Sequence, residues 1–219
     1  MQPPPLAAAP SRPLAAVLAG GESRRFGSPK ALARVGGERV VDRVLHALRG
    51  VPAEPVLIVN RPELFGDLGI PVRPDRVAGA GALAGIHAAL CWAEEAGRPG
   101  ALCVACDLPF LDPALLRRIL EIASSEPADA VVPESTGRRG VEPLCAYYRV
   151  TCRAAAEEML ARGDRQLLGL LGRIRARRLP LAEVTQLGEP EILFLNVNTP
   201  DDHRRAEELA RTTRSGVAR

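Results

Sequence analysis

The chain has 219 residues, of which 47% are hydrophobic and 25% charged, and its formal net charge is +3. This composition is typical of a globular protein and excludes a disordered or collagen-like chain. The small net charge argues against a dedicated nucleic-acid-binding protein, and with 3% aromatic residues the chain has few side chains for stacking on single strands. We expect a single domain over residues 13–210, with residues 1–12 and 211–219 as flexible tails.

Short apolar runs alternate with amphipathic stretches along the chain. This pattern predicts an α/β fold, a Rossmann-like three-layer sandwich with a mostly parallel sheet. Helical spacing predicts helices near 40–48 and 83–93. Asp112 before Pro113 predicts the N-cap of a third helix, and Thr199 with Asp202 predicts the start of a last one. Strands are expected near Leu14–Leu18, Pro55–Val59, Ala101–Ala105, Ala130–Val132, Leu144–Tyr148, Ala176–Pro180 and Leu193–Val197.

The first predicted strand runs directly into a glycine-rich loop, LAGGESRRFGSPK. Glycines let backbone N–H groups approach an anion, and Arg24, Arg25 and Lys30 add positive charge. Lys30 is the only lysine of the chain, and its compact ammonium suits a phosphate where a planar guanidinium does not fit. The loop matches neither the Walker A nor the G-x-G-x-x-G pattern. It is interpreted as a phosphate-binding loop, the alternative being a surface turn with solvated arginines.

A second glycine-rich segment, Gly79–Gly85, superficially resembles a dinucleotide-binding fingerprint. That fingerprint must directly follow a strand, and here a loop precedes it. We therefore expect these glycines to serve close packing, or the approach of the backbone to a base.

A third motif, VACDLPF, places Asp107 at the end of an apolar strand. Open α/β sheets bind ligands at the carboxyl ends of their strands, and a carboxylate beside phosphates suits Mg²⁺. The alternative is an ordinary strand-end aspartate. Cys103 and Cys106 form a C-x-x-C without a second pair, and their spacing on a strand points them to opposite faces, so no zinc or redox site is expected.

Four motifs together, LAGGESRRFGSPK, PDRVAGAGALAGIHAAL, ACDLPFL and FLNVNTPDD, resemble the molybdenum cofactor guanylyltransferases. These are nucleotidyltransferases with a Rossmann-like sheet. The resemblance runs in order from about Leu14 to Leu209. The LAGG and NVNTP motifs favour this family over the related cytidylyltransferases and sugar nucleotidyltransferases.

The resemblance implies functional roles for individual positions. Asp107 would bind both Mg²⁺ and the nucleotide, and Lys30 would contact the phosphates. In the mechanism that we expect, Lys30 and Arg25, or alternatively Arg24, stabilise the leaving pyrophosphate. Asn196 and Asn198 would help hold the acceptor, the alternative being hydrogen bonding at a strand-to-helix turn. The remaining positions implied to contact the guanosine nucleotide are Leu18, Ala19, Gly20, Gly21, Asn60 and Asp75.

The implied reaction transfers GMP from GTP to the terminal phosphate of Mo-molybdopterin, with Mg²⁺ as the cofactor. Cofactor-synthesis proteins and molybdoenzyme chaperones are the implied protein partners. Two positions depart from the family pattern: Phe26 replaces a usual Met, and Glu142 replaces a usual Gln or His on the acceptor side. The alternatives are a nucleotidyltransferase that uses CTP or a sugar phosphate, and a noncatalytic nucleotide-binding protein.

The sequence also bears on the location of the protein. No apolar run approaches the roughly 18 to 20 residues that a membrane helix needs, and the proline-rich start lacks the basic region of a signal peptide. Five cysteines without disulfide spacing indicate reduced thiols. We therefore expect a cytoplasmic protein without membrane or nucleic-acid partners.

Overall fold

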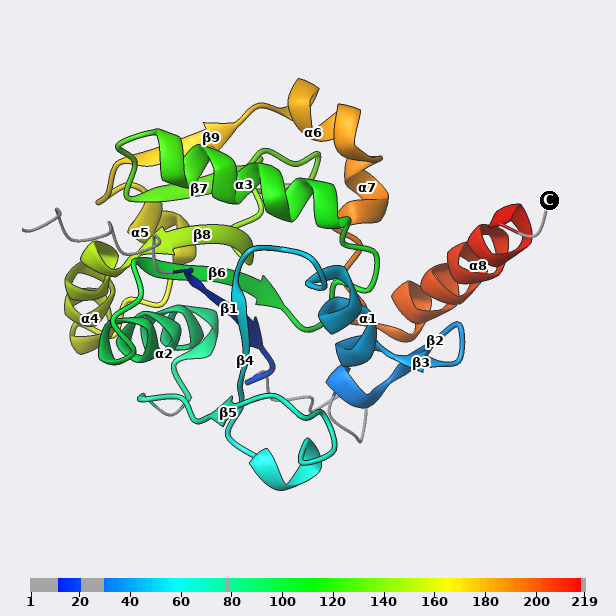
Figure 1. Cartoon of the computed structure of the whole chain (residues 1–219), viewed down its shortest axis with the longest axis horizontal. Coiled ribbons are helices and arrows are strands. Elements are labelled where there is room, and N and C mark those ends of the chain that lie inside the picture. The colour runs from blue at the N-terminus through cyan, green and yellow to red at the C-terminus, as the bar shows by residue number, and fades with distance from the viewer. Residues whose placement is uncertain (1–11, 21–29, 78, 218–219) are drawn as a thin grey trace, which may run out of the picture.

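The computed structural model describes residues 12–20, 30–77 and 79–217, and its centre is a seven-stranded sheet with the order β5-β4-β1-β6-β8-β7-β9 (Figure 1). A separate hairpin pairs β2 (Arg34–Val35) with β3 (Glu38–Arg39). The strands of the large sheet are β1 (Leu14–Leu18), β4 (Glu54–Ile58), β5 (Val72–Arg73), β6 (Gly100–Ala105), β7 (Ala130–Pro133), β8 (Cys145–Arg149) and β9 (Ala176–Leu179).

Eight α-helices and three short 3-10 helices connect the strands in the described part of the chain. The 3-10 helices span Lys30–Leu32, Pro62–Leu64 and Val150–Cys152. Within the described ranges, no helix is long and apolar enough to cross a membrane. The α-helices are α1 (Val40–Ala47), α2 (Gly81–Glu95), α3 (Pro113–Ser125), α4 (Arg153–Ala161), α5 (Leu167–Leu171), α6 (Leu181–Leu187), α7 (Pro190–Leu193) and α8 (Pro200–Val217).

The sheet is parallel except for one strand. β1 runs parallel to β4 and β6, β4 to β5, and β7 to β9. Only β8, between β6 and β7, runs antiparallel to its neighbours. The predicted α/β class with a mostly parallel sheet is confirmed.

Helices cover both faces of this sheet and divide the core into two layers. Alternate residues of a strand point to opposite faces, so Ala15 and Val17 of β1 pack with the side of α1 and α3, and Leu14 and Ala16 pack with the side of α2 and α4. A strand buried on both faces must be apolar throughout, which explains the continuous LAAVL of β1. Cys103 and Cys106 lie in opposite layers, as their spacing predicts.

Side-chain caps begin two of the predicted helices. Asp112 accepts a hydrogen bond of 2.6 Å from the Ala114 N–H at the start of α3. At the start of α8, Thr199 and Asp202 exchange hydrogen bonds, with the Asp202 N–H donating to Thr199 Oγ1 and the Thr199 N–H to Asp202 Oδ2. Both helix starts are therefore confirmed, and each satisfies N–H groups that a helix leaves without partners.

One predicted strand is wrong. Residues 194–198 follow α7 without joining any sheet. Leu193, Leu195 and Val197 are nonetheless buried, with Leu195 and Val197 packed in a small cluster beside α8. Leu193 ends helix α7 and the Leu195 N–H closes a turn on the Ile192 carbonyl, so these buried residues belong to a helix end and a connecting segment that pairs with no described strand.

Other elements are absent from the sequence prediction. The two-residue strands β2, β3 and β5 are too short to give a periodic signal, and the helices α4 to α7 were not assigned. α8 continues to Val217, beyond residue 210 where the sequence analysis ends the domain.

A substitution of Gly100, at the start of β6, tests the close packing of β6 against β8. A Cβ at this position would lie 2.3 Å from the Tyr148 carbonyl oxygen and 2.6 Å from the Tyr147 hydroxyl. Because both neighbours belong to the adjacent strand β8, Gly100→Ala is expected to lower the free energy of unfolding by about 2 kcal/mol. Urea unfolding measures this, with Gly66→Ala as the control, since Gly66 has no atom within 4 Å of its ideal Cβ. Equal stability of the two variants would contradict the packing.

Candidate active site

Three neighbouring parallel strands end at the same level. Leu18, the last residue of β1, pairs with Ile58 of β4 on one side and with Ala105 of β6 on the other. The ladder continues for one step, with the Ala19 N–H donating to the Ile58 carbonyl at 2.9 Å and the Cys106 N–H to the Leu18 carbonyl at 3.1 Å. The next strand of this sheet along the chain, β4, lies on one side of β1, and the chain later returns to place β6 on the other side. Where the strand order reverses in this way, a crevice for a ligand opens at the strand ends.

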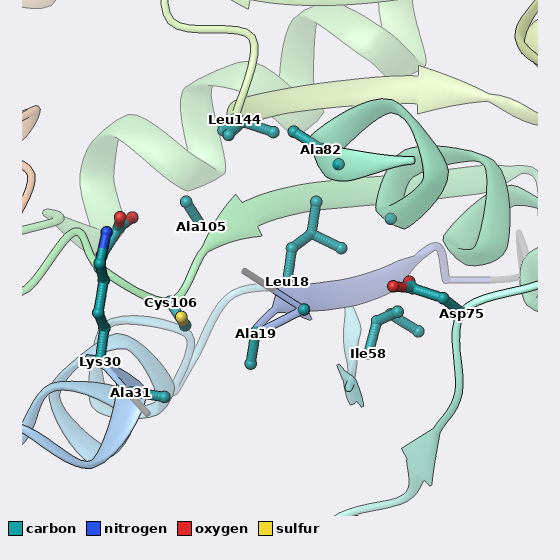
Figure 2. Close-up of a pocket in the computed structure, with 14 residues that line it drawn as sticks. Leu18, Ala19, Lys30, Ala31, Ile58, Asp75, Ala82, Ala105, Cys106 and Leu144 are labelled. Carbon is teal, nitrogen blue, oxygen red and sulfur yellow. The ribbon is translucent and has the colours of Figure 1, made fainter. Parts of the chain in front are cut away.

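A cavity lies beyond these strand ends, and Figure 2 shows residues that line it. Leu18, Ala19 and Ala82 are among its apolar lining residues, while Lys30 and Asp75 lie on opposite sides of it (Figure 2). The cavity brings together six residues to which the sequence analysis assigns a role: Leu18, Ala19, Gly20, Lys30, Asp75 and Asp107.

Asn60 does not line the cavity, but it holds Asp75 in place. The Asn60 side-chain amide donates to Asp75 Oδ2 at 3.0 Å, and the Asp75 backbone N–H donates to Asn60 Oδ1 at 3.1 Å. Gly20 approaches the same carboxylate, because a Cβ on it would lie 2.8 Å from Asp75 Oδ2. Any larger residue at position 20 would displace the carboxylate.

The second carboxylate oxygen of Asp75 is an acceptor without a donor. Oδ1 is buried and has no hydrogen-bond partner within the described residues. Burial raises the pKa of Asp75, and the hydrogen bond from Asn60 opposes that shift. A buried acceptor without a partner is unfavourable, so a ligand with a hydrogen-bond donor at this point would gain affinity.

Lys30 lies on the other side of the cavity (Figure 2), Asp107 interacts with its charge, and both residues contact the same segment of the chain. Lys30 Nζ donates to Asn198 Oδ1, and the Val197 N–H donates to the Asp107 carbonyl at 3.0 Å. The segment before α8 therefore contacts both residues. Its position depends on Asp202, whose Oδ2 accepts from the Asn198 N–H at 3.1 Å as well as from Thr199.

Asp107 is a partly buried carboxylate in a positive field. Burial raises its pKa, and the charge of Lys30 acts in the opposite direction. Glu142 lies nearby, with Oε1 accepting from the Leu144 N–H at 3.3 Å. Burial raises the pKa of Glu142, and the charge of Asp107 contributes in the same direction.

The donors at this end suit one kind of metal ion. Within the described ranges, no group of three or more His, Cys, Asp or Glu side chains is arranged to hold a metal. Mg²⁺ needs no such group, since it commonly binds one or two carboxylates together with substrate phosphates and water. Asp107 on the cavity wall therefore fits a magnesium ion that arrives with a phosphate ligand.

The glycine-rich segment at the start of α2 serves the cavity as well. Gly81 and Gly85 line it, and a Cβ on Gly85 would lie 3.4 Å from the Leu18 side chain. Gly81 has a φ of +70°, which favours glycine. Close packing does not explain Gly79 and Gly81, which have no atom within 4 Å of an ideal Cβ; both instead have positive φ angles, of +67° and +70°.

Some residues with an assigned role cannot be placed in the cavity. Gly21, Arg24, Arg25 and Phe26 lie outside the described residues. Asn196 belongs to the segment before α8 but is not among the described residues that line the cavity.

Two contributions to the site escaped the sequence analysis. Leu144 lines the cavity because its carbonyl accepts from the Ala105 N–H at 2.8 Å, a pairing of β6 with the turn before β8. Asp202 was recognised only as a helix start, although its carboxylate also fixes Asn198 beside Lys30. The spacing N-T-P-D-D could have indicated this second role.

Comparisons with known proteins agree with this geometry. Residues 15–178 match the MobA-like NTP transferase domain. A protein of Pelotomaculum thermopropionicum named probable molybdenum cofactor guanylyltransferase is 40% identical over 91% of this chain and 94% of its own. The molybdenum cofactor guanylyltransferase of Rhodobacter capsulatus is 36% identical over 89% of this chain and 95% of its own.

A solved structure is similar over nearly the same extent. The crystal structure of molybdopterin-guanine dinucleotide biosynthesis protein A from Archaeoglobus fulgidus superposes with a TM-score of 0.77 at 29% identity, covering 90% of this chain and 98% of that one. The chain therefore belongs to the MobA-like NTP transferase domain family and, within it, to the molybdenum cofactor guanylyltransferases.

Proposed function

We propose that this protein transfers GMP from GTP to the terminal phosphate of Mo-molybdopterin, forming the molybdopterin guanine dinucleotide cofactor and releasing pyrophosphate. The observation that carries the proposal is the polarity of the cavity. The unpartnered Asp75 oxygen lies on one side and Lys30 on the other (Figure 2), and the lining residue Asp107 interacts with the charge of Lys30. A nucleoside triphosphate has the complementary arrangement, a base with hydrogen-bond donors at one end and phosphates at the other. The names of the relatives support the same activity.

The Asp75 end favours guanine. A carboxylate accepts hydrogen bonds only, and the guanine edge presents two adjacent donors, the ring N1–H and the exocyclic amino group. The cytosine edge presents one donor beside an acceptor, which would face a carboxylate oxygen unfavourably. Asp75, oriented by Asn60, is therefore the proposed determinant of the base.

The Lys30 end suits the phosphates. Asp107 would hold Mg²⁺, which when bound supplies positive charge to the α- and β-phosphate oxygens. Lys30 adds a point charge for the leaving pyrophosphate. Arg25 is proposed to share that role, and Gly20 and Gly21 to bring their backbone close to the nucleotide.

The proposed reaction is an in-line substitution at the α-phosphorus. An oxygen of the acceptor phosphate, whose second pKa is about 6, is already ionised and forms the new bond to phosphorus. The bond to the oxygen that bridges the α- and β-phosphates breaks, and the pyrophosphate leaves with the electron pair. No strong general base is needed, so the residues act by positioning and charge stabilisation.

The acceptor is proposed to enter beside the segment before α8. Asn198 already contacts Lys30, so an acceptor phosphate bound there would lie next to the charge that serves the nucleotide. Asn196 is proposed to contribute from the same segment. Glu142 adds a second negative charge near Asp107. This charge would repel the acceptor phosphate, so we propose that Mg²⁺ or an arginine lies between the two and reduces the repulsion.

The proposal extends to the setting of the reaction. Residues 13–210 would act as a single nucleotidyltransferase domain that receives and passes on the cofactor through cofactor-synthesis proteins and molybdoenzyme chaperones. All five cysteines are free thiols, which supports a reducing compartment such as the cytoplasm.

A transfer assay tests the proposed function directly. The chain is incubated with Mo-molybdopterin, Mg²⁺ and either GTP or CTP labelled at the α-phosphate. With GTP we expect labelled dinucleotide cofactor and one pyrophosphate for each transfer. Transfer from CTP alone would identify a cytidylyltransferase, and nucleotide binding without pyrophosphate release would identify a noncatalytic binding protein.

Asp107→Asn tests the proposed metal ligand. An amide is a weaker ligand for Mg²⁺, so kcat should fall about 10²-fold to 10³-fold, and half-maximal activity should require more Mg²⁺. The measurement is a magnesium titration of the transfer rate, with Asp201→Asn as the control on an exposed aspartate at the start of α8. A titration like that of the unmodified chain would remove Asp107 from the metal site.

Asp75→Asn tests the proposed base contact. The amide replaces one acceptor oxygen by a donor, which would oppose a guanine N–H. The KM for GTP should rise by about 10-fold to 100-fold, corresponding to roughly 1.5–3 kcal/mol for a hydrogen bond to a charged group, and the preference for GTP over CTP should shrink. An unchanged GTP to CTP ratio of kcat/KM would show that another residue selects the base.

A further inference from the structure

The only tryptophan of the chain, Trp92, lies in the C-terminal half of α2 and contacts the residues on both sides of Asp75. Its indole Nε1–H donates to the Pro74 carbonyl at 3.3 Å. The guanidinium carbons of Arg76 and Arg73 lie 3.9 Å and 5.2 Å from the centre of a Trp92 ring. Three of the four residues from 73 to 76 therefore contact one side chain.

The fourth residue of that stretch is Asp75, whose side chain is held from the other direction. Its carboxylate accepts a hydrogen bond from Asn60, which follows β4. It also lies so close to Gly20 that a Cβ there would be 2.8 Å from Oδ2. Asp75 is thus fixed between the strand ends on one side and α2 on the other.

The chain around Asp75 has little regular structure of its own. β5 consists of two residues at the edge of the sheet, where the Val59 N–H donates to the Arg73 carbonyl at 2.9 Å. No helix or strand includes residues 74–77. The contacts of Trp92 with its neighbours therefore contribute directly to where this segment lies.

α2 is well placed to serve as the support. It packs on the core layer that includes Ile58 and Leu83, with Trp92 at the margin of that layer, and its first turn lines the cavity through Gly81 and Ala82. Arg76 is also ion-paired with Glu95 one turn of α2 further along. Guanidinium groups over an indole ring are attracted by its π electrons, so the two arginines and the hydrogen bond hold the segment to one rigid helix.

We propose that Trp92 is a positioning residue for the nucleotide base, which holds segment 73–76 on α2 and thereby sets the place of the Asp75 carboxylate in the cavity. The inference rests on the proposed function, because it assigns Asp75 to the base. Trp92 itself does not line the cavity among the described residues, so it acts through Asp75 and not by contact with the ligand.

Two variants of Trp92 separate its contributions. Trp92→Phe keeps a ring beneath the two guanidinium groups and removes the N–H donor, whereas Trp92→Leu removes both. We expect the KM for GTP to rise about tenfold in Trp92→Leu and less in Trp92→Phe. We expect kcat to stay within about twofold, because Lys30 lies on the other side of the cavity from Asp75 (Figure 2) and Asp107 interacts with the charge of Lys30. Cys91→Ala, a partly buried neighbour on α2, is the matched control and should leave both constants unchanged.

A double-variant cycle distinguishes positioning from a general loss of structure. If Trp92 acts through Asp75, then adding Trp92→Leu to Asp75→Asn should raise the KM for GTP little further, since coupled residues are not additive. An equal loss of affinity in both backgrounds, or an unchanged KM in Trp92→Leu alone, would overturn the inference. If the unmodified chain itself fails to bind GTP, the proposed function fails. If it binds GTP and Trp92→Leu binds it equally well, only the present inference fails.

Discussion

The register of three parallel strands is the constraint on which the site depends. β1 is held between β4 and β6 so that Leu18, Ile58 and Ala105 end at one level. A slip of one residue would move a strand end by about 3.3 Å and would turn its apolar side chains to the wrong face. Because β1 is buried on both faces, a slipped sheet would lose packing in both core layers. The apolar core thus fixes the place of the polar groups at the strand ends.

Two partly buried carboxylates give the cavity its chemical character. Burial raises the pKa of both Asp75 and Asp107. The ionised form of each carboxylate is therefore less stable in the folded chain than it would be in water. Neighbouring donors relieve this only in part, through Asn60 at one carboxylate and the charge of Lys30 at the other. A ligand with hydrogen-bond donors at one end and a bound cation at the other would complete the compensation, and by mass action such a ligand stabilises the folded chain. The same two groups therefore account for both affinity and orientation.

Much of this arrangement could be predicted from local sequence. Six strands of the sheet were predicted to within about a residue, five of them from apolar runs, and Asp112 and Asp202 marked helix starts because capping depends on neighbouring residues. The prediction of a strand over 193–197 is wrong because buried apolar residues also occur at a helix end and in a connecting segment, and Leu193 ends α7. The contacts of Trp92 with Arg73 and Arg76, and of Asn198 with Lys30, join residues far apart in the sequence. Only the folded chain brings these residues together, so no local sequence pattern predicts their contacts.

The bond between Lys30 and Asn198 joins residues 168 positions apart, and this separation bears on how the protein is made. A ribosome releases Lys30 early and the segment before α8 near the end of synthesis, so Lys30 lacks its Asn198 partner for most of that time. Closing so long a loop costs conformational entropy, although this cost grows only slowly with length. A nascent chain could form the sheet through β6 and still lack the Asn198 contact to Lys30. Completion of the site thus coincides with completion of the fold, and a chain truncated before Asn198 would lack the contact that joins this segment to Lys30.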